Sequence, residues 1–303
     1  MNPTAMVTGA SSGLGRAIAL GLARRGYRVF AGVRSADAAA ELVRADAAIA
    51  PVMLDVASDA QMCDAARELD RACSDAGLTV LVNAAGYATY TPVEYADSGE
   101  VARLFDVVAF APYRLANALL PALRRAAGPA GARGRAKIVN IASWAALDAS
   151  PFVGFYAAAK AAGLRLGQAQ AFELDRFGID VVSVVPGIMR TRFAEGAAAQ
   201  IAAAIARLPA GGRADYGASM QHMADMSLAV PHSRLVPSAD AVAAKVVGII
   251  AKRRPRHQYL LGFDTKLITF INRWLPFRLQ RAIKSALYGL DARAREQLPP
   301  ATA

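Results

Sequence analysis

The fold is decided by one stretch of sequence, Thr8-Gly9-Ala10-Ser11-Ser12-Gly13-Leu14-Gly15. A β-rich run at residues 5–8 leads directly into it, and Leu14, Ile18 and Leu22 follow at the spacing of one helix face. Glycine lets a backbone approach a pyrophosphate closely, and a helix N-terminus offers unpaired N–H groups to its charge. A glycine turn alone also fits a tight connection, but its place between strand and helix favours a dinucleotide site. The candidate residues of this site are Gly9, Ser11, Ser12, Gly13, Leu14 and Gly15.

Strand-like and helix-like segments alternate through the first two-thirds of the chain. The predicted strands cover residues 5–8, 28–33, 52–55, 79–83, 137–141, 180–185 and 258–261. Further helices are predicted over residues 36–47, 58–76, 197–207 and 239–252. Continuously apolar strands separated by helices indicate a parallel sheet that is covered on both faces. We therefore predict a single-domain α/β Rossmann fold over residues 1–262: a doubly wound parallel sheet whose ligands bind at the C-terminal ends of the strands.

Composition narrows the class of protein. The chain has 303 residues, is 55% apolar and carries a formal charge of +11, which favours a globular protein with an anionic partner. Its basic residues are not interleaved with aromatics on a nucleic-acid module, so we predict no nucleic acid and prefer a phosphorylated cofactor or an acidic membrane surface. Cys63 and Cys73 fall on a predicted surface helix, and three dispersed histidines indicate no metal site. With no signal peptide and no apolar run of roughly 20 residues, we expect a cytoplasmic protein.

The end of the second predicted strand indicates which cofactor is bound. A carboxylate there would bind the ribose 2′-hydroxyl of NAD, whereas an arginine would bind the 2′-phosphate of NADP. The sequence has Val33 followed by Arg34, and Ser12 could add a hydrogen bond, so we predict NADP(H) in preference to NAD(H). The alternative is that Arg34 is only a solvated surface residue. Other cofactor contacts are predicted at strand ends three and four: Asp55, Val56, Asn83, Ala84 and Gly86.

Tyr156 and Lys160 give the strongest chemical signal, with Ser143 ahead of them at the end of the fifth predicted strand. Residues four apart lie on one helix face, so the ammonium can sit beside the phenol. A nearby cation favours the phenolate, and we expect it to lower the pKa of Tyr156 from its ordinary value of about 10. Tyr156 is therefore the candidate general acid and base, and Ser143 would hold the substrate oxygen.

Together these motifs resemble the short-chain dehydrogenase/reductase family, most closely the branch of hydroxysteroid and retinol dehydrogenases. The resemblance covers about residues 4–262 and also includes the segment from Pro186 through Gly187 and Ile188 to Thr191. It implies that Ile188 touches the nicotinamide ring and Thr191 its carboxamide, and that residues 188–237 are a variable substrate-binding region. It further implies an oxidoreductase that interconverts hydroxyl and carbonyl groups, with Tyr156 and Lys160 also touching the cofactor, and a homo-oligomer, either dimer or tetramer.

One position departs from the family pattern. Where the family usually has an asparagine that holds a proton-relay water, this chain has Val108. Three interpretations follow. The relay runs through backbone carbonyls and water at some loss of rate, which we favour; the substrate supplies the missing polar group; or the protein is a cofactor-binding regulator with weak or lost catalysis.

The substrate side is predicted from apolar residues after the catalytic motif. A lipophilic alcohol or ketone is expected against walls drawn from Phe152, Phe155, Phe193, Tyr216, Met220, Met223 and Met226. We expect Tyr216, His222 and the methionines to lie in a loop. Residues 263–303 form a basic, amphipathic extension, interrupted at Pro276 and predicted to contain two short helices. It could touch a membrane peripherally, cap the substrate pocket or pack on a partner subunit.

Overall fold

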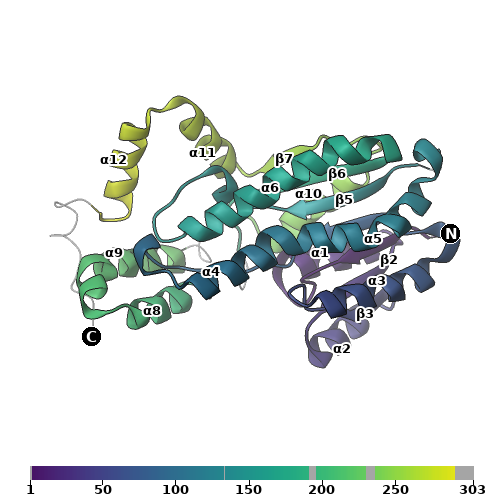
Figure 1. Ribbon diagram of the computed structural model, residues 1–303, viewed down its shortest axis with the longest axis horizontal. Coiled ribbons are helices and arrows are strands. Elements are labelled where there is room, and N and C mark those ends of the chain that lie inside the picture. The colour runs from purple at the N-terminus through teal and green to yellow at the C-terminus, as the bar shows by residue number, and fades with distance from the viewer. Residues whose placement is uncertain (1, 133, 191–195, 230–235, 291–303) are drawn as a thin grey trace.

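The protein is built around one parallel sheet, shown in Figure 1. The computed structural model describes residues 2–132, 134–190, 196–229 and 236–290. In that part of the chain, seven strands pair in the order β3-β2-β1-β4-β5-β6-β7, every pair being parallel. The strands are β1 (Thr4–Val7), β2 (Arg28–Val33), β3 (Ile49–Met53), β4 (Val80–Asn83), β5 (Ala136–Ile141), β6 (Ile179–Pro186) and β7 (Gln258–Leu261). The predicted doubly wound sheet is confirmed.

Helices cover both faces of the sheet. The described α-helices are α1 (Gly13–Ala23), α2 (Ala36–Ala45), α3 (Asp59–Cys73), α4 (Ser98–Phe105), α5 (Ala111–Ala127), α6 (Gly154–Leu174), α8 (Ala197–Arg207), α9 (Ala210–Ala229), α10 (Ala239–Ile250), α11 (Phe263–Trp274) and α12 (Phe277–Leu287). One core joins α1, α2 and α10 to the sheet, and a second core joins α3, α5 and α6 to its other face. All of β1 and β4 is buried, which explains why these strands are apolar at every position.

The third strand was predicted at residues 52–55 but lies earlier, at Ile49–Met53. Its pairing with β2 begins at Ile49 and runs through Pro51 to Met53. Proline is depleted in strands because it cannot donate to the ladder, so the pattern around Pro51 does not indicate a strand. β3 lies at the edge of the sheet, and an edge strand tolerates proline because one side of it needs no hydrogen bonds.

Two further predictions were wrong. Tyr216, His222 and the methionines lie in the helix α9 rather than in a loop. Gly211, Gly212 and Gly217 made this segment look irregular, but the ring of Tyr95 fills the space beside Gly212. Packing against α8 therefore outweighs the low helix propensity of glycine. On α3, Cys63 is exposed as expected, whereas Cys73 faces the core.

Three of the helices that follow the catalytic motif gather at one end of the molecule. Figure 1 shows α8, α9 and α12 at the end opposite the N-terminus, with α11 leading from the sheet to α12. The two helices predicted in the C-terminal extension are confirmed, and they are separated at Pro276 as expected. No helix in the described ranges is both long and apolar enough to span a membrane.

Candidate active site

The glycine turn after β1 packs so closely that larger residues cannot replace two of its glycines. A Cβ on Gly9, whose φ is +65°, would lie 2.8 Å from the Cα of Ala85, and one on Gly15 would lie 2.3 Å from the carbonyl oxygen of Gly9. Gly13, with φ +55°, has nothing within 4 Å of its Cβ position. The turn is thus tight toward the protein and open at the N-terminus of α1. This is the shape that the phosphates of a dinucleotide require.

Hydrogen bonds attach this turn to the neighbouring strand ends. The hydroxyl of Thr8 accepts the N–H groups of Ala84 and Ala85 at 3.0 and 3.1 Å. At the end of β4, the side-chain amide of Asn83 donates to the Oδ1 of Asn140 on β5 at 2.8 Å. Asn83 therefore bridges two neighbouring strands near their C-terminal ends. Thr8, by contrast, was not singled out from the sequence, although a hydroxyl before a glycine turn is a usable signal.

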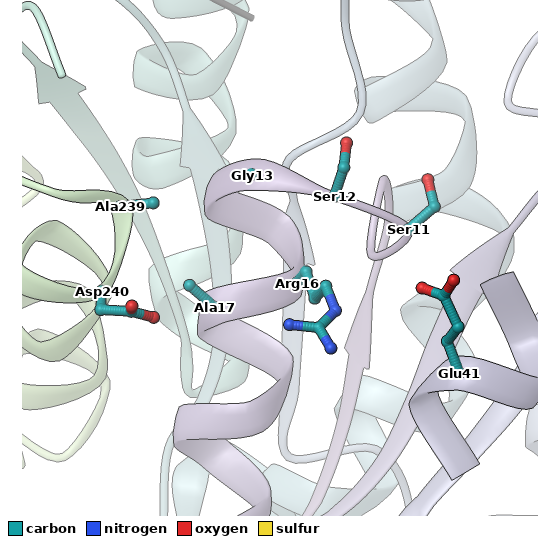
Figure 2. Close-up of a pocket in the computed structure, with 8 residues that line it drawn as sticks. All are labelled: Ser11, Ser12, Gly13, Arg16, Ala17, Glu41, Ala239 and Asp240. Carbon is teal, nitrogen blue, oxygen red and sulfur yellow. The ribbon is translucent and has the colours of Figure 1, made fainter. Parts of the chain in front are cut away.

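A cavity of about 330 Å³ opens at the start of α1. Figure 2 shows the hydroxyls of Ser11 and Ser12 on the turn, with the Arg16 guanidinium between α1 and the Glu41 carboxylate of α2. Arg34 is exposed just beyond β2 and is not part of this lining. Sequence reasoning missed Arg16, although it lies one helical turn after Ser12. The cavity offers hydroxyls, a guanidinium and a helix N-terminus to a phosphate, and the carboxylates of Glu41 and Asp240 add two opposing charges.

Two of the predicted cofactor contacts, Asp55 and Val56, follow the end of the third strand. Asp55 lies two residues beyond β3, where its carboxylate accepts the N–H of Ala57 at 3.0 Å. Its own N–H donates to the side chain of Gln61 at 2.7 Å. Val56 is buried beside it. The Asp55 carboxylate is therefore committed to shaping its own turn and retains only part of its accepting capacity for a ligand.

Ser143, Tyr156 and Lys160 come together beside the C-terminal end of β5. Ser143 follows β5, and its hydroxyl caps the short helix η5 (Trp144–Leu147) by accepting the N–H of Ala145 at 3.2 Å. Tyr156 lies in the first turn of α6 and is hydrogen-bonded to Ser143. The ammonium of Lys160 lies 6.0 Å from the centre of the Tyr156 ring and donates to the carbonyl of Ile141 at 2.9 Å. The structure therefore brings the three predicted catalytic residues into one group.

The electrostatics of this group differ from the expectation. Burial raises the pKa of Tyr156 to about 12, and the hydrogen bond from Ser143 offsets only part of that rise. Burial also lowers the pKa of Lys160 to about 8. The predicted depression of the Tyr156 pKa by Lys160 is thus wrong for this structure. Desolvation outweighs the charge because the ammonium is directed at the Ile141 carbonyl.

Val108 lies in a one-turn π-helix, η3 (Asp106–Phe110), between α4 and α5. Its side chain is buried against Leu104 and Ala159, so it acts as a core residue. Its carbonyl oxygen lies over α6, 3.4 Å from where a Cβ on Gly163 would be. Four residues on, Pro112 has no N–H to give that carbonyl the usual α-helical bond. The proline therefore removes the i+4 donor of a carbonyl that lies against the helix that carries Lys160.

The segment after β6 is held by a residue that the sequence did not reveal. Pro186 ends β6, and the N–H of Gly187 donates to the carbonyl of Leu261 at 2.8 Å. The N–H of Ile188 donates to the carboxylate of Asp264 in the first turn of α11, at 2.6 Å. Asp264 becomes recognisable only once β7 is known to pair with β6. Thr191 and Phe193 lie outside the described residues.

The predicted substrate walls divide between two clusters. Phe152, Tyr216, Met220 and Met223 pack together with the Tyr156 ring. Phe155 instead packs with Leu104 and Val108, in a cluster that the Tyr156 ring also contacts, and Met226 belongs to neither cluster. The first cluster also includes residues that sequence reasoning missed, among them Ala88, Tyr90, Ile201, Leu208 and Leu290.

Phe152 is backbone-strained, with φ of +64°. A bulky residue rarely adopts this conformation unless surrounding contacts fix it. Here its carbonyl accepts the N–H of Thr91 at 2.8 Å, and its ring meets Tyr216 edge-on with centroids 6.1 Å apart. The strain places an aromatic ring four residues before the candidate catalytic tyrosine, in the wall of the apolar cluster.

The C-terminal helices are attached to the loop that follows Ser143. The side chain of Asp148 is only 5% exposed, and its carboxylate accepts a hydrogen bond from the ammonium of Lys284 on α12 at 2.5 Å. Asn272 of α11 donates to Asp148 at 2.8 Å and to the carbonyl of Leu147 at 2.6 Å. Burial would raise the pKa of Asp148, but its bonds to Lys284, Ser150 and Asn272 together lower it. This clamp, defined by Asp148, Asn272 and Lys284, was not predicted from the sequence.

The glycine turn and the adjacent serine, tyrosine and lysine define a Rossmann-fold oxidoreductase. A family model described as short chain dehydrogenase matches residues 3–202, and the chain belongs to that family. It is 29% identical over 287 residues to human retinol dehydrogenase 5, covering 93% of this chain and 87% of that protein. It is 27% identical to the NADPH-dependent 3-dehydrocapnine reductase of Ornithobacterium rhinotracheale, covering 85% and 87%. A short-chain dehydrogenase structure from Streptomyces avermitilis superposes with a TM-score of 0.73 at 24% identity, covering 96% and 98%. The family resemblance seen in the sequence is confirmed.

Proposed function

We propose that the protein interconverts a hydroxyl and a carbonyl on a lipophilic substrate of steroid, retinoid or fatty type, using NADP(H). The convergence of Ser143, Tyr156 and Lys160 beside the apolar cluster carries this proposal. The nicotinamide cofactor, when bound, supplies or accepts the hydride. The protein supplies the binding turn, the position of the substrate oxygen and the proton.

In the direction of reduction, Tyr156 donates its hydroxyl proton to the substrate oxygen, which Ser143 also contacts. With a pKa of about 12, Tyr156 is fully protonated at neutral pH and is ready to act as an acid. Lys160, with a pKa of about 8, is mostly charged and can stabilise the phenolate as it forms. In the direction of oxidation the same groups run in reverse.

Tyr156 regains its proton through a relay that uses the main-chain carbonyl of Val108 in place of a polar side chain. That carbonyl lies over Gly163, one turn from Lys160, and lacks an i+4 donor. A water bonded there would connect Lys160 to solvent at some loss of rate.

Because we propose that this relay is slow, Val108→Asn should raise turnover, whereas Val108→Ala, which adds no polar group, should not. Single-turnover kinetics at saturating NADPH measures the step directly. Unchanged or lower turnover in Val108→Asn, with cofactor binding intact, would contradict a limiting relay.

Two observations support NADP(H). At the end of β2, Val33 stands where an NAD-binding protein would carry a carboxylate and is followed by Arg34, and Arg16 adds a second guanidinium at the turn. The relative from Ornithobacterium rhinotracheale is named as NADPH-dependent. The lipophilic substrate class is supported by the aromatic and methionine wall around Tyr156 and by the human relative named retinol dehydrogenase 5.

The decisive experiment measures NADPH oxidation against a panel of lipophilic ketones and aldehydes, using the wild type, Tyr156→Phe and Tyr113→Phe. Tyr113 is a half-exposed tyrosine on α5, outside the site, and serves as the matched control. We expect Tyr156→Phe to lose roughly 100-fold or more in turnover while NADPH fluorescence still reports binding. Full activity in Tyr156→Phe would exclude it as the acid. Cofactor binding without turnover in the wild type would favour a cofactor-binding regulator.

A further inference from the structure

Exposed apolar side chains concentrate on the two C-terminal helices. Residues 263–287 contain eight of the sixteen large apolar side chains that are exposed in the described part of the chain. Phe263, Trp274 and Phe277 are the most exposed of the eight, at 80%, 66% and 73%. An isolated exposed leucine needs no explanation, but a cluster of this size indicates a binding surface.

The exposed residues follow the helix period. On α11, Phe263, Leu267, Phe270 and Trp274 are spaced by four, three and four residues and therefore share one face. On α12, Leu279, Ile283 and Leu287 are spaced by four and form a second stripe. We call these seven residues, together with Phe277, the tail surface. Its apolar character is a property of regular helices and not of a frayed terminus.

Basic residues accompany the tail surface. Lys266, Arg273, Arg278 and Arg281 are all exposed, and none of them forms an ion pair with any described residue. Asp264 is the one acidic residue of these helices, and its carboxylate accepts a hydrogen bond from the N–H of Ile188. The tail surface thus presents aromatic and aliphatic groups within a strongly positive field.

The opposite sides of these helices are already in contact with the protein. The clamp of Asp148, Asn272 and Lys284 holds both helices, and the hydroxyl of Ser219 on α9 donates to the carbonyl of Gly289 at 2.7 Å. The tail surface is therefore the outer side of a docked element. Figure 1 shows α12 at the end of the molecule, on the same side as α9.

We propose that the tail surface docks the protein peripherally on an anionic lipid bilayer. Helices of this kind lie in the membrane interface, with the apolar face among the acyl chains and Trp, Lys and Arg at the headgroups. A second copy of this chain is a poorer occupant, because a two-fold contact would bring two sets of four unpaired cations together. The proposal does not depend on the reaction assigned above.

Vesicle flotation of the full chain tests the proposal. We expect binding to phosphatidylcholine vesicles that contain phosphatidylglycerol, little binding to phosphatidylcholine alone, and loss of binding in high salt. Emission from Trp274 should shift to the blue on binding. Trp274→Phe should still bind but should lose most of that shift, which would show that the shift comes from Trp274 and not from the other tryptophan, Trp144.

Paired variants separate the two contributions. Phe270→Ser with Phe277→Ser removes apolar contact, and Arg278→Glu with Arg281→Glu reverses charge; each pair should weaken binding about tenfold or more. Arg24→Glu with Arg25→Glu, exposed at the end of α1, is the control for charge and should cost less than about threefold. Enzyme kinetics with a water-soluble substrate should be the same in all of these variants.

Three results would overturn the proposal. The first is absence of binding to anionic vesicles at low salt. The second is binding that the tail variants and the Arg24/Arg25 control weaken equally, because it would then depend on net charge alone. The third is a dimer in solution whose Trp274 is already shielded and which dissociates in Phe270→Ser with Phe277→Ser, because a second copy would then cover the tail surface.

Discussion

The first βα turn and the C-terminal helices are held in place by different kinds of contact. Around Gly9 and Gly15 the backbone touches backbone at distances that leave no room for a methyl group. On α11 and α12, by contrast, most large side chains face outward, and a few polar groups around Asp148 provide the attachment. The comparison shows that the turn is specified by steric exclusion and the C-terminal helices by a small number of hydrogen bonds. The two regions should therefore respond differently to substitution.

The largest effect should come from Gly15→Ala. The added methyl would lie 2.3 Å from the Gly9 carbonyl, so the turn must shift, at a cost of about 3 kcal/mol in stability and with loss of cofactor binding. Gly248→Ala on α10 is the control, because nothing lies within 4 Å of its Cβ position and alanine favours a helix by about 1 kcal/mol. Thermal unfolding should show opposite signs for the two. The same sign in both would break the comparison.

Asp148→Asn should have the next largest effect, but a local one. The substitution removes the buried negative charge that pairs with Lys284. We expect it to reduce the local stability of α11 and α12 by about 2 kcal/mol, which would be seen mainly as faster hydrogen exchange in these helices. Asp175→Asn, at an exposed carboxylate that pairs with Arg135, should cost less than about 1 kcal/mol. Because the Asp148 pKa lies below its ordinary value, the clamp contributes stability above about pH 4 and loses it as pH falls further. For the comparison to hold, amide hydrogens of the glycine turn must exchange more slowly than those of α11 and α12 in the wild type and in Asp148→Asn alike.

The third effect should come from the titration of Lys160, which changes kcat/KM gradually with pH. Its ammonium is present below a pKa of about 8, so kcat/KM for NADPH, which reports the free enzyme, should fall about tenfold per pH unit above that value. Tyr156 does not titrate in this range. Lys160→Arg keeps the positive charge to higher pH. The fall in kcat/KM should therefore move to higher pH in this variant, even if its turnover is lower. A flat profile to pH 10 in the wild type would show that the lysine charge is not needed.

Arg34→Ala should give the smallest effect, because Arg34 is exposed. The ratio of kcat/KM with NADPH to that with NADH should fall about fivefold, since one solvent-exposed phosphate contact is lost. Arg44→Ala, on the exposed side of α2, should leave the ratio unchanged. If Arg16→Ala lowers the ratio and Arg34→Ala does not, the phosphate is recognised inside the cavity at α1.

The same contrast explains what the sequence could predict. The glycine turn and the Tyr156–Lys160 pair were readable because their requirements are local: a backbone conformation, or two positions one helical turn apart. Asp264 and Asp148 act on residues more than 70 and 120 positions away, respectively, so no local pattern could indicate their partners. The pKa of Tyr156 was misjudged for a related reason. Burial depends on everything packed around a side chain, whereas the sequence showed only the neighbouring charge.

The bond from Ile188 to Asp264 has a consequence for where the chain can be divided. A boundary after Gly262 looks natural, because the last strand ends there and two separate helices follow. Yet Asp264 holds the backbone of the segment that leaves β6. A protein shortened at Gly262 would lose the support of that segment together with the helices. The extension is therefore not a detachable module, and a fusion, tag or circular permutation that respects the fold must keep the first turn of α11 joined to β7.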